Sequence, residues 1–331
     1  MRGSTWRASL ERARRSFFAS RWLRQTTEHP SVVLVICPNL AVDHTLRLEE
    51  LRLGRVHRTR DYARRAGGKG VNVARTLSAL GEEPLLCGLV GGGAGRFIEE
   101  ELAKEDIRAE LVPMQAENRT CVIVLSRKGE ATVVNETGPT VTEVEALRGR
   151  VRSLIGESQA VALMGSLPPG LPEDLYAEAV SECRRADIPC LVDTAGPALE
   201  TALAAGPTYA KPNQVEAEAL LGRTVRDWPA AAQEIRERGA NVVLITRGAR
   251  TAFLSGPAFN ARLSPPVVPV VNPTGAGDAL AAGLLAGHLR GGSLREVVVL
   301  GMAAAAASVQ YGYGRVRPAE IRPELVGFEA L

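Results

Sequence analysis

Aromatic residues, paired cysteines and long apolar runs are all scarce in this chain of 331 residues. Aromatic side chains make up only 4% of the sequence, so a core must be built mainly from Ala, Val and Leu. The five cysteines show no CxxC or Cys/His spacing, which argues against a zinc site or a disulfide framework and predicts reduced, buried thiols in a cytoplasmic protein. No apolar run approaches the roughly 20 residues that a transmembrane helix needs, so we expect no membrane partner.

Positive and negative charges nearly balance in the sequence, which has a formal net charge of +3. This mild excess does not indicate a nucleic-acid partner. Much of it lies in residues 1–30, which are rich in arginine and contain only Glu11 and Glu28 as acidic residues. We expect residues 1–30 to be a disordered basic extension, although an Arg-rich, acid-poor stretch also fits a transit peptide. Residues 31–331 are then long enough for one large α/β domain or two smaller ones.

The most informative stretch is the Pro- and Gly-rich turn at residues 271–278, which runs directly into a helical pattern at residues 279–290. Backbone N–H groups at a helix start lack intrahelical partners, and together with the helix dipole they favour an anion. Gly275 and Gly277 would let a phosphate approach the backbone closely. Asp278 would repel that anion unless it had a chemical task, such as taking the proton of an attacking hydroxyl. From the local pattern alone, Asp278 could equally be a helix cap.

Two further segments ahead of this stretch could meet a polar ligand. Val32–Ile36 is a β-branched run typical of a buried parallel strand, and Asp43 follows it at the end where α/β sheets bind ligands, although a surface position is the alternative. A glycine-rich turn at residues 67–70 precedes a helix that Gly81 ends. This turn is not a Walker-type ATP site, because Val71 occupies the position of the hydroxyl residue.

Other segments alternate between apolar and polar residues, as half-exposed strands do. We expect them to form one small sheet that projects from the main body, within about residues 44–66 and 111–136. The expected strands are 45–48, 56–60, 120–125 and 131–135, the last two joined by a turn at Arg127, Lys128 and Gly129.

From residue 85 onward, short apolar strands alternate with helical patterns, which predicts an α/β fold with a three-layer α/β/α architecture and a site along one sheet edge. Asp193 ends one of these strands and either approaches that edge or is structural. The expected strands are 85–90, 161–164, 190–192 and 242–245, and the expected helices include 96–105, after a turn at 91–95, and 175–185.

Five motifs in a matching order carry a family resemblance. They are Pro38-Asn39-Leu40-Ala41-Val42-Asp43, Gly67-Gly68-Lys69-Gly70-x-Asn72, Gly165-Ser166-Leu167-Pro168-Pro169-Gly170, Lys211-Pro212-Asn213-x-x-Glu216 and Gly275-Ala276-Gly277-Asp278. Over residues 31–318 the chain resembles the ribokinase-like (PfkB) carbohydrate kinases, and within them the branch of 1-phosphofructokinase and tagatose-6-phosphate kinase.

The resemblance implies a ribokinase-like fold in which the small sheet is a lid. In this family the lid commonly also joins two subunits into a homodimer. It implies ATP and Mg²⁺ as cofactors and Asp278 as the catalytic base, with Gly275, Ala276 and Gly277 offering N–H groups to the transferred phosphoryl group. The implied sugar-binding residues are Asp43, Gly67, Gly68, Lys69, Asn72, Arg119 and Ser166. The implied nucleotide-binding residues are Lys211, Asn213, Thr246, Arg247, Gly248, Ala249, Thr251, Gly277 and Ser308, and Glu216 and Asn213 are the implied metal-site residues.

Arg119 bears on the choice of sugar. The phosphosugar branch carries an arginine at this strand start, and a guanidinium fork matches a phosphate group; a solvated charge is the alternative. The segment Asn135-Glu136-Thr137-Gly138-Pro139 also resembles that branch. The leading hypothesis is therefore an ATP-dependent kinase that converts a hexose phosphate, of the fructose 1-phosphate or tagatose 6-phosphate type, to a bisphosphate. The alternatives are a kinase for an unphosphorylated sugar or nucleoside, and a non-catalytic sugar-phosphate-binding protein.

Overall fold

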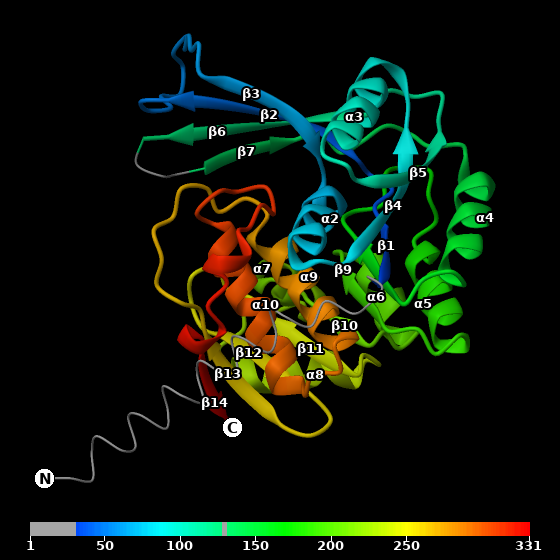
Figure 1. Ribbon diagram of the computed structural model, residues 1–331, viewed down its shortest axis with the longest axis vertical. Helices are drawn as coiled ribbons and strands as arrows, with labels where there is room; N and C mark the ends of the chain where they lie inside the picture. Colours follow the sequence, from blue (N-terminus) through cyan, green and yellow to red (C-terminus); the bar gives the residue numbers. More distant parts are fainter. Residues whose placement is uncertain (1–30, 128–130) are drawn as a thin grey trace, which may run out of the picture.

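The computed structural model describes residues 31–127 and 131–331 (Figure 1). The basic extension expected at residues 1–30, and Lys128 and Gly129 of the expected hairpin turn, lie outside the described residues. In the part that is described, no helix has the length and apolar character that a membrane crossing requires.

A ten-stranded sheet forms the middle layer, in the order β14-β13-β12-β11-β10-β9-β8-β1-β4-β5. All neighbouring pairs from β11 to β5 are parallel, and β12, β13 and β14 add antiparallel pairs at the other edge. The strands are β1 (Val32–Ile36), β4 (Glu83–Val90), β5 (Arg108–Pro113), β8 (Ala160–Met164), β9 (Cys190–Asp193), β10 (Tyr209–Ala210), β11 (Val242–Ile245), β12 (Ala252–Ser255), β13 (Asn260–Ser264) and β14 (Gly327–Ala330).

Helices cover both faces of this sheet, and each face has its own core. Alternate residues of β1 separate the two cores, because Leu34 and Ile36 pack toward one face and Val33 and Val35 toward the other. The first face carries α4 (Val144–Ile155), α5 (Leu175–Arg185), α6 (Pro197–Ala204), α7 (Gln214–Leu221) and α8 (Trp228–Glu237). The second carries α2 (Lys69–Leu80), α3 (Gly92–Lys104), α9 (Ala276–Leu289) and α10 (Leu294–Ser308), and short 3₁₀ turns follow at η1 (Pro318–Glu320) and η2 (Pro323–Leu325). The expected three-layer α/β/α fold is confirmed.

A separate four-stranded sheet projects from the body, as Figure 1 shows in blue and green. Its strand order is β3-β2-β6-β7. The central strands β2 and β6 are parallel, and each edge strand, β3 and β7, pairs antiparallel with its neighbour. The strands are β2 (Ala41–Leu48), β3 (Tyr62–Gly67), β6 (Arg119–Ser126) and β7 (Ala131–Asn135). Every residue of β7 is exposed to solvent.

Two expected boundaries in this region are wrong. Residues 56–60 form a loop instead of a strand, because the Thr59 hydroxyl bonds both to the carbonyl of Arg47 and to the N–H of Asp61 and so closes a turn. Residues 111–113 belong to β5 of the main sheet and not to the small sheet.

The helix expected at residues 96–105 also begins earlier than the sequence pattern indicates. The glycine run at residues 92–95 is already its first turn, since α3 starts at Gly92. Side chains from a distant loop stabilise this start: Glu117 Oε1 accepts the N–H of Ala94 at 2.9 Å, and Asn118 Oδ1 accepts the N–H of Gly91 at 2.8 Å. These contacts replace the local cap that the sequence lacks.

Candidate active site

The glycine-rich turn before α9 can adopt its shape only with glycine. Gly275 is the N-cap residue and has φ 88°, and a Cβ atom there would lie 2.4 Å from the backbone nitrogen of Gly314. The first helical residues follow at once, and the N–H of Ala276 donates to the carbonyl of Pro273 at 3.2 Å. That N–H group is therefore already engaged in a turn, while Gly277 and Asp278 complete the first helical positions.

Asp278 is not the helix cap, because Gly275 occupies that position and Asp278 is the third residue of α9. Its carboxylate instead faces α2, where Asn72 Nδ2 donates to Oδ2 at 2.8 Å. Burial raises the pKa of Asp278 to about 6, and the charge of Asp193 adds to this effect, while Lys69 and the bond from Asn72 lower it. A carboxyl group held near this value can exchange a proton close to neutral pH, as a general base must.

Asp193 lies at the centre of the charged end of the site. It ends β9 and is 1% exposed, and its two carboxylate oxygens contact two ammonium groups: Lys69 Nζ at 2.7 Å and Lys211 Nζ at 2.8 Å. Burial alone would raise the pKa of Asp193, but the two lysines hold this pKa below its usual value. The sequence left open whether Asp193 approaches this edge, and the structure places it there.

Asn213 and Glu216 form a capping box at the start of α7. Asn213 Oδ1 accepts the N–H of Glu216 at 3.0 Å, and Glu216 Oε2 accepts the N–H of Asn213 at 2.8 Å. The other oxygen, Glu216 Oε1, lies 3.3 Å from Lys69 Nζ. The cap thus fixes Glu216 with one oxygen directed at the charged end of the site.

Asp43 and Gly67 are matched across neighbouring strands. Asp43 on β2 is 6% exposed, and a Cβ atom on Gly67 of β3 would lie 2.2 Å from its carboxyl carbon. Only glycine at residue 67 leaves room for this carboxylate. Burial raises the pKa of Asp43 to about 6; the nearby charges of Arg75 and Arg119 lower it and that of Asp278 raises it. Asp43 and Asp278 therefore lie near enough to interact.

The remaining expected sugar-binding residues surround these carboxylates. Gly68 is the N-cap of α2, with φ 106°, so Lys69 and Asn72 lie in the first turn of that helix. Ser166 follows β8 and accepts a hydrogen bond from Asn39 Nδ2 at 3.0 Å. Arg119 directs its fork at backbone carbonyls: Nε and Nη2 donate to Asn39 at 3.3 and 3.2 Å, and Nη1 donates to Glu136 at 2.9 Å.

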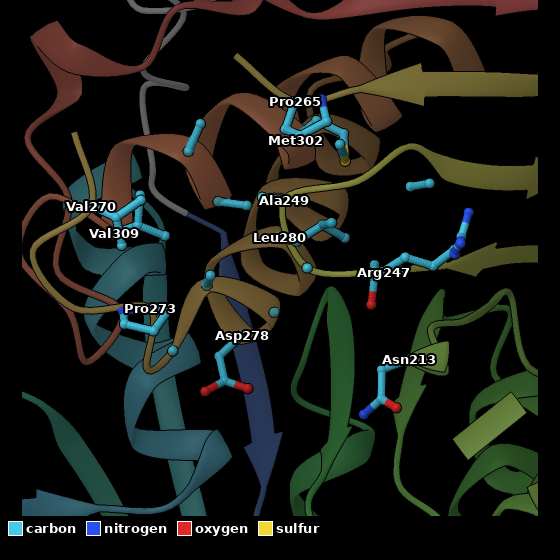
Figure 2. Close-up of a pocket in the computed structure, with 18 of the residues that line it drawn as sticks. Asn213, Arg247, Ala249, Pro265, Val270, Pro273, Asp278, Leu280, Met302 and Val309 are labelled. Carbon is cyan, nitrogen blue, oxygen red and sulfur yellow. The ribbon is translucent and has the colours of Figure 1, made fainter. Parts of the chain in front are cut away.

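A cavity of about 640 Å³ extends from this charged end. Figure 2 shows Asp278 and Asn213 at one end and Met302 and Pro265 at the other. Its lining contains Lys69, which was expected at the sugar, and most of the residues expected at the phosphate and nucleotide, namely Lys211, Asn213, Thr246, Arg247, Gly248, Ala249, Gly275, Ala276, Gly277 and Asp278.

Two of the expected nucleotide-binding residues are not part of this lining. Thr251 follows the turn that carries Gly248 and Ala249 and lies outside the cavity wall. Ser308 is fully buried, and its hydroxyl donates to the carbonyl of Ala305 one turn earlier in α10 at 2.8 Å. The cavity is lined instead by Ala305 and Ala306, three and two residues before Ser308.

The apolar part of the wall was not predicted from the sequence. Its members share apolar side chains and come from the segment after β13, from α9, and from α10 and its C-cap: Pro265, Pro266, Val267, Val268, Val270, Leu280, Met302 and Val309. The available signal was the Pro- and Val-rich run at residues 265–271, which is apolar but fits no strand or helix. Val267 is fully exposed, so this run is not core.

The fold and the site have clear relatives. A family model described as pfkB family carbohydrate kinase matches residues 35–320. Escherichia coli phosphofructokinase-2 in complex with fructose-6-phosphate is similar at 25% identity and a TM-score of 0.80, over 89% of this chain and 99% of that one. A carbohydrate kinase from Agrobacterium tumefaciens matches at 26% identity and a TM-score of 0.71, over 91% of this chain and 100% of that one. A Thermotoga maritima protein described as a possible 1-phosphofructokinase, at 23% identity, shares the fold with a TM-score of 0.82, over 91% and 99% of the two chains.

The matched residues include the glycine-rich turns before α2 and α9, the three buried carboxylates of Asp43, Asp193 and Asp278, and the cavity beside them. The chain belongs to the pfkB family of carbohydrate kinases and is an ATP-dependent sugar kinase.

Proposed function

We propose that this kinase phosphorylates a hexose phosphate to a bisphosphate, with Asp278 as the catalytic base. The observation that supports this most is the position of Asp278, buried beside Asn72 at the end of the cavity and within electrostatic reach of Asp43. An acceptor hydroxyl held by Asp43 and Asn72 would lie against the carboxylate. The small sheet, which carries Asp43, would then act as a lid that excludes water from the sugar.

The nucleotide fits the opposite end of the cavity. Met302, Ala305 and Val309 of the α10 region offer an apolar surface for adenine, and the segment at residues 265–270 faces them. Lys211 and Lys69, both paired with Asp193, supply positive charge near the phosphates. This division matches a substrate that is apolar at one end and polyanionic at the other.

In the proposed reaction, Asp278 takes the proton of the acceptor hydroxyl while the hydroxyl oxygen bonds to the γ-phosphorus of ATP. The bond from that phosphorus to the bridging β-phosphate oxygen breaks, and ADP leaves. Backbone N–H groups at the start of α9 and the ammonium groups of Lys69 and Lys211 stabilise charge on the transferred group. Because these groups are fixed before the reaction, little reorganisation is needed.

The residues present are compatible with Mg²⁺ bound together with ATP. Among the described residues no group of three His, Cys, Asp or Glu side chains could hold a metal by itself. Mg²⁺ usually keeps several waters and uses one or two carboxylates plus substrate phosphates, and Glu216 Oε1 can supply such a carboxylate, directly or through water. When bound, Mg²⁺ would neutralise charge on the β- and γ-phosphates. We assign Asn213 the role of holding Glu216 through the cap instead of that of a direct ligand.

One observation favours the second candidate, a kinase for an unphosphorylated sugar. Three donors of the Arg119 fork already bond to the carbonyls of Asn39 and Glu136. A sugar phosphate would have to use its remaining donors or displace these bonds. Against this stands the similarity to phosphofructokinases, one of which was solved with fructose-6-phosphate.

ADP release measured with a panel of acceptors separates the two candidates. We expect fructose 1-phosphate, tagatose 6-phosphate or fructose 6-phosphate to give the largest kcat/KM. Ribose as the sole active acceptor would contradict the proposal of a sugar phosphate, and no acceptor-dependent release with any of them would contradict a hexose-phosphate kinase altogether.

We further propose that two copies of the chain associate through the small sheet. β7 is an exposed edge strand, with Val133 46% and Val134 62% exposed, and an open edge of this kind is a ready template for pairing. Sedimentation should show a dimer that a Val134→Glu substitution dissociates. A monomer in the wild type would contradict the dimer.

A further inference from the structure

The amide of Asn72 lies between a carboxylate and a guanidinium. Its Nδ2 donates to Asp278 Oδ2 at 2.8 Å, and its Oδ1 accepts from Arg75 Nη1 at 3.1 Å. Arg75 has donors only, so it can face only the oxygen end of the amide. The same contact directs the nitrogen end at Asp278. With the amide reversed, its oxygen would face the carboxylate oxygen and its nitrogen would face the guanidinium, and both contacts would be repulsive.

Arg75 is itself fixed on three sides. Nη2 donates to the carbonyl of Ala66 at 2.8 Å, Nη1 reaches the carbonyl of Tyr313 at 3.5 Å, and Nε and Nη2 bond to the two carboxylate oxygens of Glu105. The side chain of Arg75 is only 4% exposed. A guanidinium this deeply buried has little freedom to turn, so the orientation it gives to Asn72 is stable.

Glu105 provides the counter-charge that makes this burial possible. It follows the last residue of α3, and its carboxylate also contacts Arg315 Nη2 at 2.9 Å. Burial acts to raise the pKa of Glu105, but the bonds from Arg75 and Arg315 hold it below the usual value, so Glu105 is ionised at neutral pH. The chain of contacts runs from Glu105 through Arg75 and Asn72 to Asp278.

We propose that Arg75 and Glu105 are positioning residues of the kinase reaction, which hold Asn72 in the one amide orientation that donates to the catalytic base. Neither residue touches the substrate; both act through Asn72. The Asn72 bond engages Oδ2, and we assign Oδ1 to the acceptor hydroxyl. The inference rests on the proposed role of Asp278 as the base.

Removing Arg75 has a consequence for pH that a loss of packing does not have. A hydrogen bond to a carboxylate favours its charged form, so losing the Asn72 donor raises the pKa of Asp278. The acid limb of kcat/KM then moves to higher pH. The other ionisable groups that face Asp278 are Asp43 on β2, Lys69 on α2, Asp193 at the end of β9, Lys211 after β10 and the neutral thiol of Cys37 after β1. Substituting Arg75 also removes a charge that lowers the pKa of Asp43, whereas Asn72→Leu keeps Arg75 and so separates the loss of the donor from this effect.

The test is a pH profile of the full-length enzyme with saturating ATP. We expect Arg75→Met to lower kcat about tenfold and to move the acid limb upward by about one pH unit. Asn72→Leu removes the same donor and should move the limb as far, and the double variant should move it no further, because both substitutions break one chain of contacts. Arg315→Met is the matched control: it removes the other cation on Glu105 without contacting Asn72, and it should keep the wild-type limb.

If Arg75→Met fails to fold, Glu105→Gln offers a second test, because it keeps the shape of the Glu105 side chain. It removes the charge that holds Arg75 and should move the limb in the same direction by a smaller amount. A lowered kcat with an unmoved limb in either variant would overturn the positioning role, as would a limb shift in the double variant equal to the sum of the single shifts. If Asp278→Asn retained near-normal turnover, the proposed base itself would fail, which is a different result.

Discussion

Lys69 Nζ lies 2.7 Å from Asp193 Oδ1, although the two residues are 124 positions apart in the sequence. Lys69 opens α2 and Asp193 ends β9, so this contact joins the glycine-rich turn of one helix to the carboxyl edge of the main sheet. Lys211 contacts the other carboxylate oxygen at 2.8 Å. One buried aspartate therefore holds in place two cations that we assign to the phosphates.

Asp193→Ala should lower the free energy of unfolding by about 3 kcal/mol at neutral pH, because it leaves the buried Lys211 without its counter-charge. The folded-state pKa of Asp193 is lowered, so its contribution is present above its usual pKa of about 4 and is lost as the pH falls through the folded value. Urea unfolding at several pH values measures this. Asp174→Ala, which removes an exposed partner of Arg148, should cost less than about 1 kcal/mol. Equal losses for the two variants would show that Asp193 does not stabilise the buried Lys211.

Gly67→Ala should raise the KM for the sugar substrate about tenfold or more and leave the KM for ATP nearly unchanged. The added methyl group would meet the Asp43 carboxyl group at 2.2 Å and force it to move. Steady-state kinetics with each substrate varied in turn measures the split. Gly149→Ala on α4, where a Cβ atom meets nothing within 4 Å, is the matched control and should behave as wild type. A rise in the KM for ATP alone would contradict the assignment of Asp43 to the sugar-binding part of the site.

Ala305→Phe should have the opposite selectivity, raising the KM for ATP about tenfold with little effect on the sugar. Ala305 lines the apolar end of the cavity, and a phenyl ring would fill the space that we assign to adenine. Ala146→Phe, at an exposed position of α4, controls for the effect of adding a ring to a helix. Unchanged affinity for ATP in the Ala305 variant would mean that adenine binds elsewhere.

The alternation of apolar strands with helical patterns predicts the main body well, because burial on both faces demands β-branched runs such as Val32–Ile36. Glycine turns also mark the starts of α2 and α9 directly, since φ near +90° at Gly275 excludes other residues. The contacts of Asp193, by contrast, depend on strand order, which no local pattern encodes. The loop at residues 56–60 depends on two bonds of the Thr59 hydroxyl, which close a turn where the alternating pattern predicts a strand.

Arg119→Ala should raise the KM for a phosphosugar about tenfold or more while changing the KM for ATP much less. The guanidinium lies between the carbonyls of Asn39 and Glu136 at the start of β6, where its remaining donors can meet a phosphate. Arg127→Ala, just after the same strand, removes a side chain that is 79% exposed and should have no effect. Equal changes in the two KM values for the Arg119 variant would indicate that this residue only supports the small sheet.

The central claim is that Asp278 removes the proton of the acceptor hydroxyl, and Asp278→Asn tests it most directly. The amide keeps the size of the side chain but cannot act as a base at neutral pH. We expect turnover to fall by roughly 10²-fold or more, while the affinity for the sugar substrate, measured by equilibrium binding, stays close to that of the wild type. Near-normal turnover of Asp278→Asn would contradict the account.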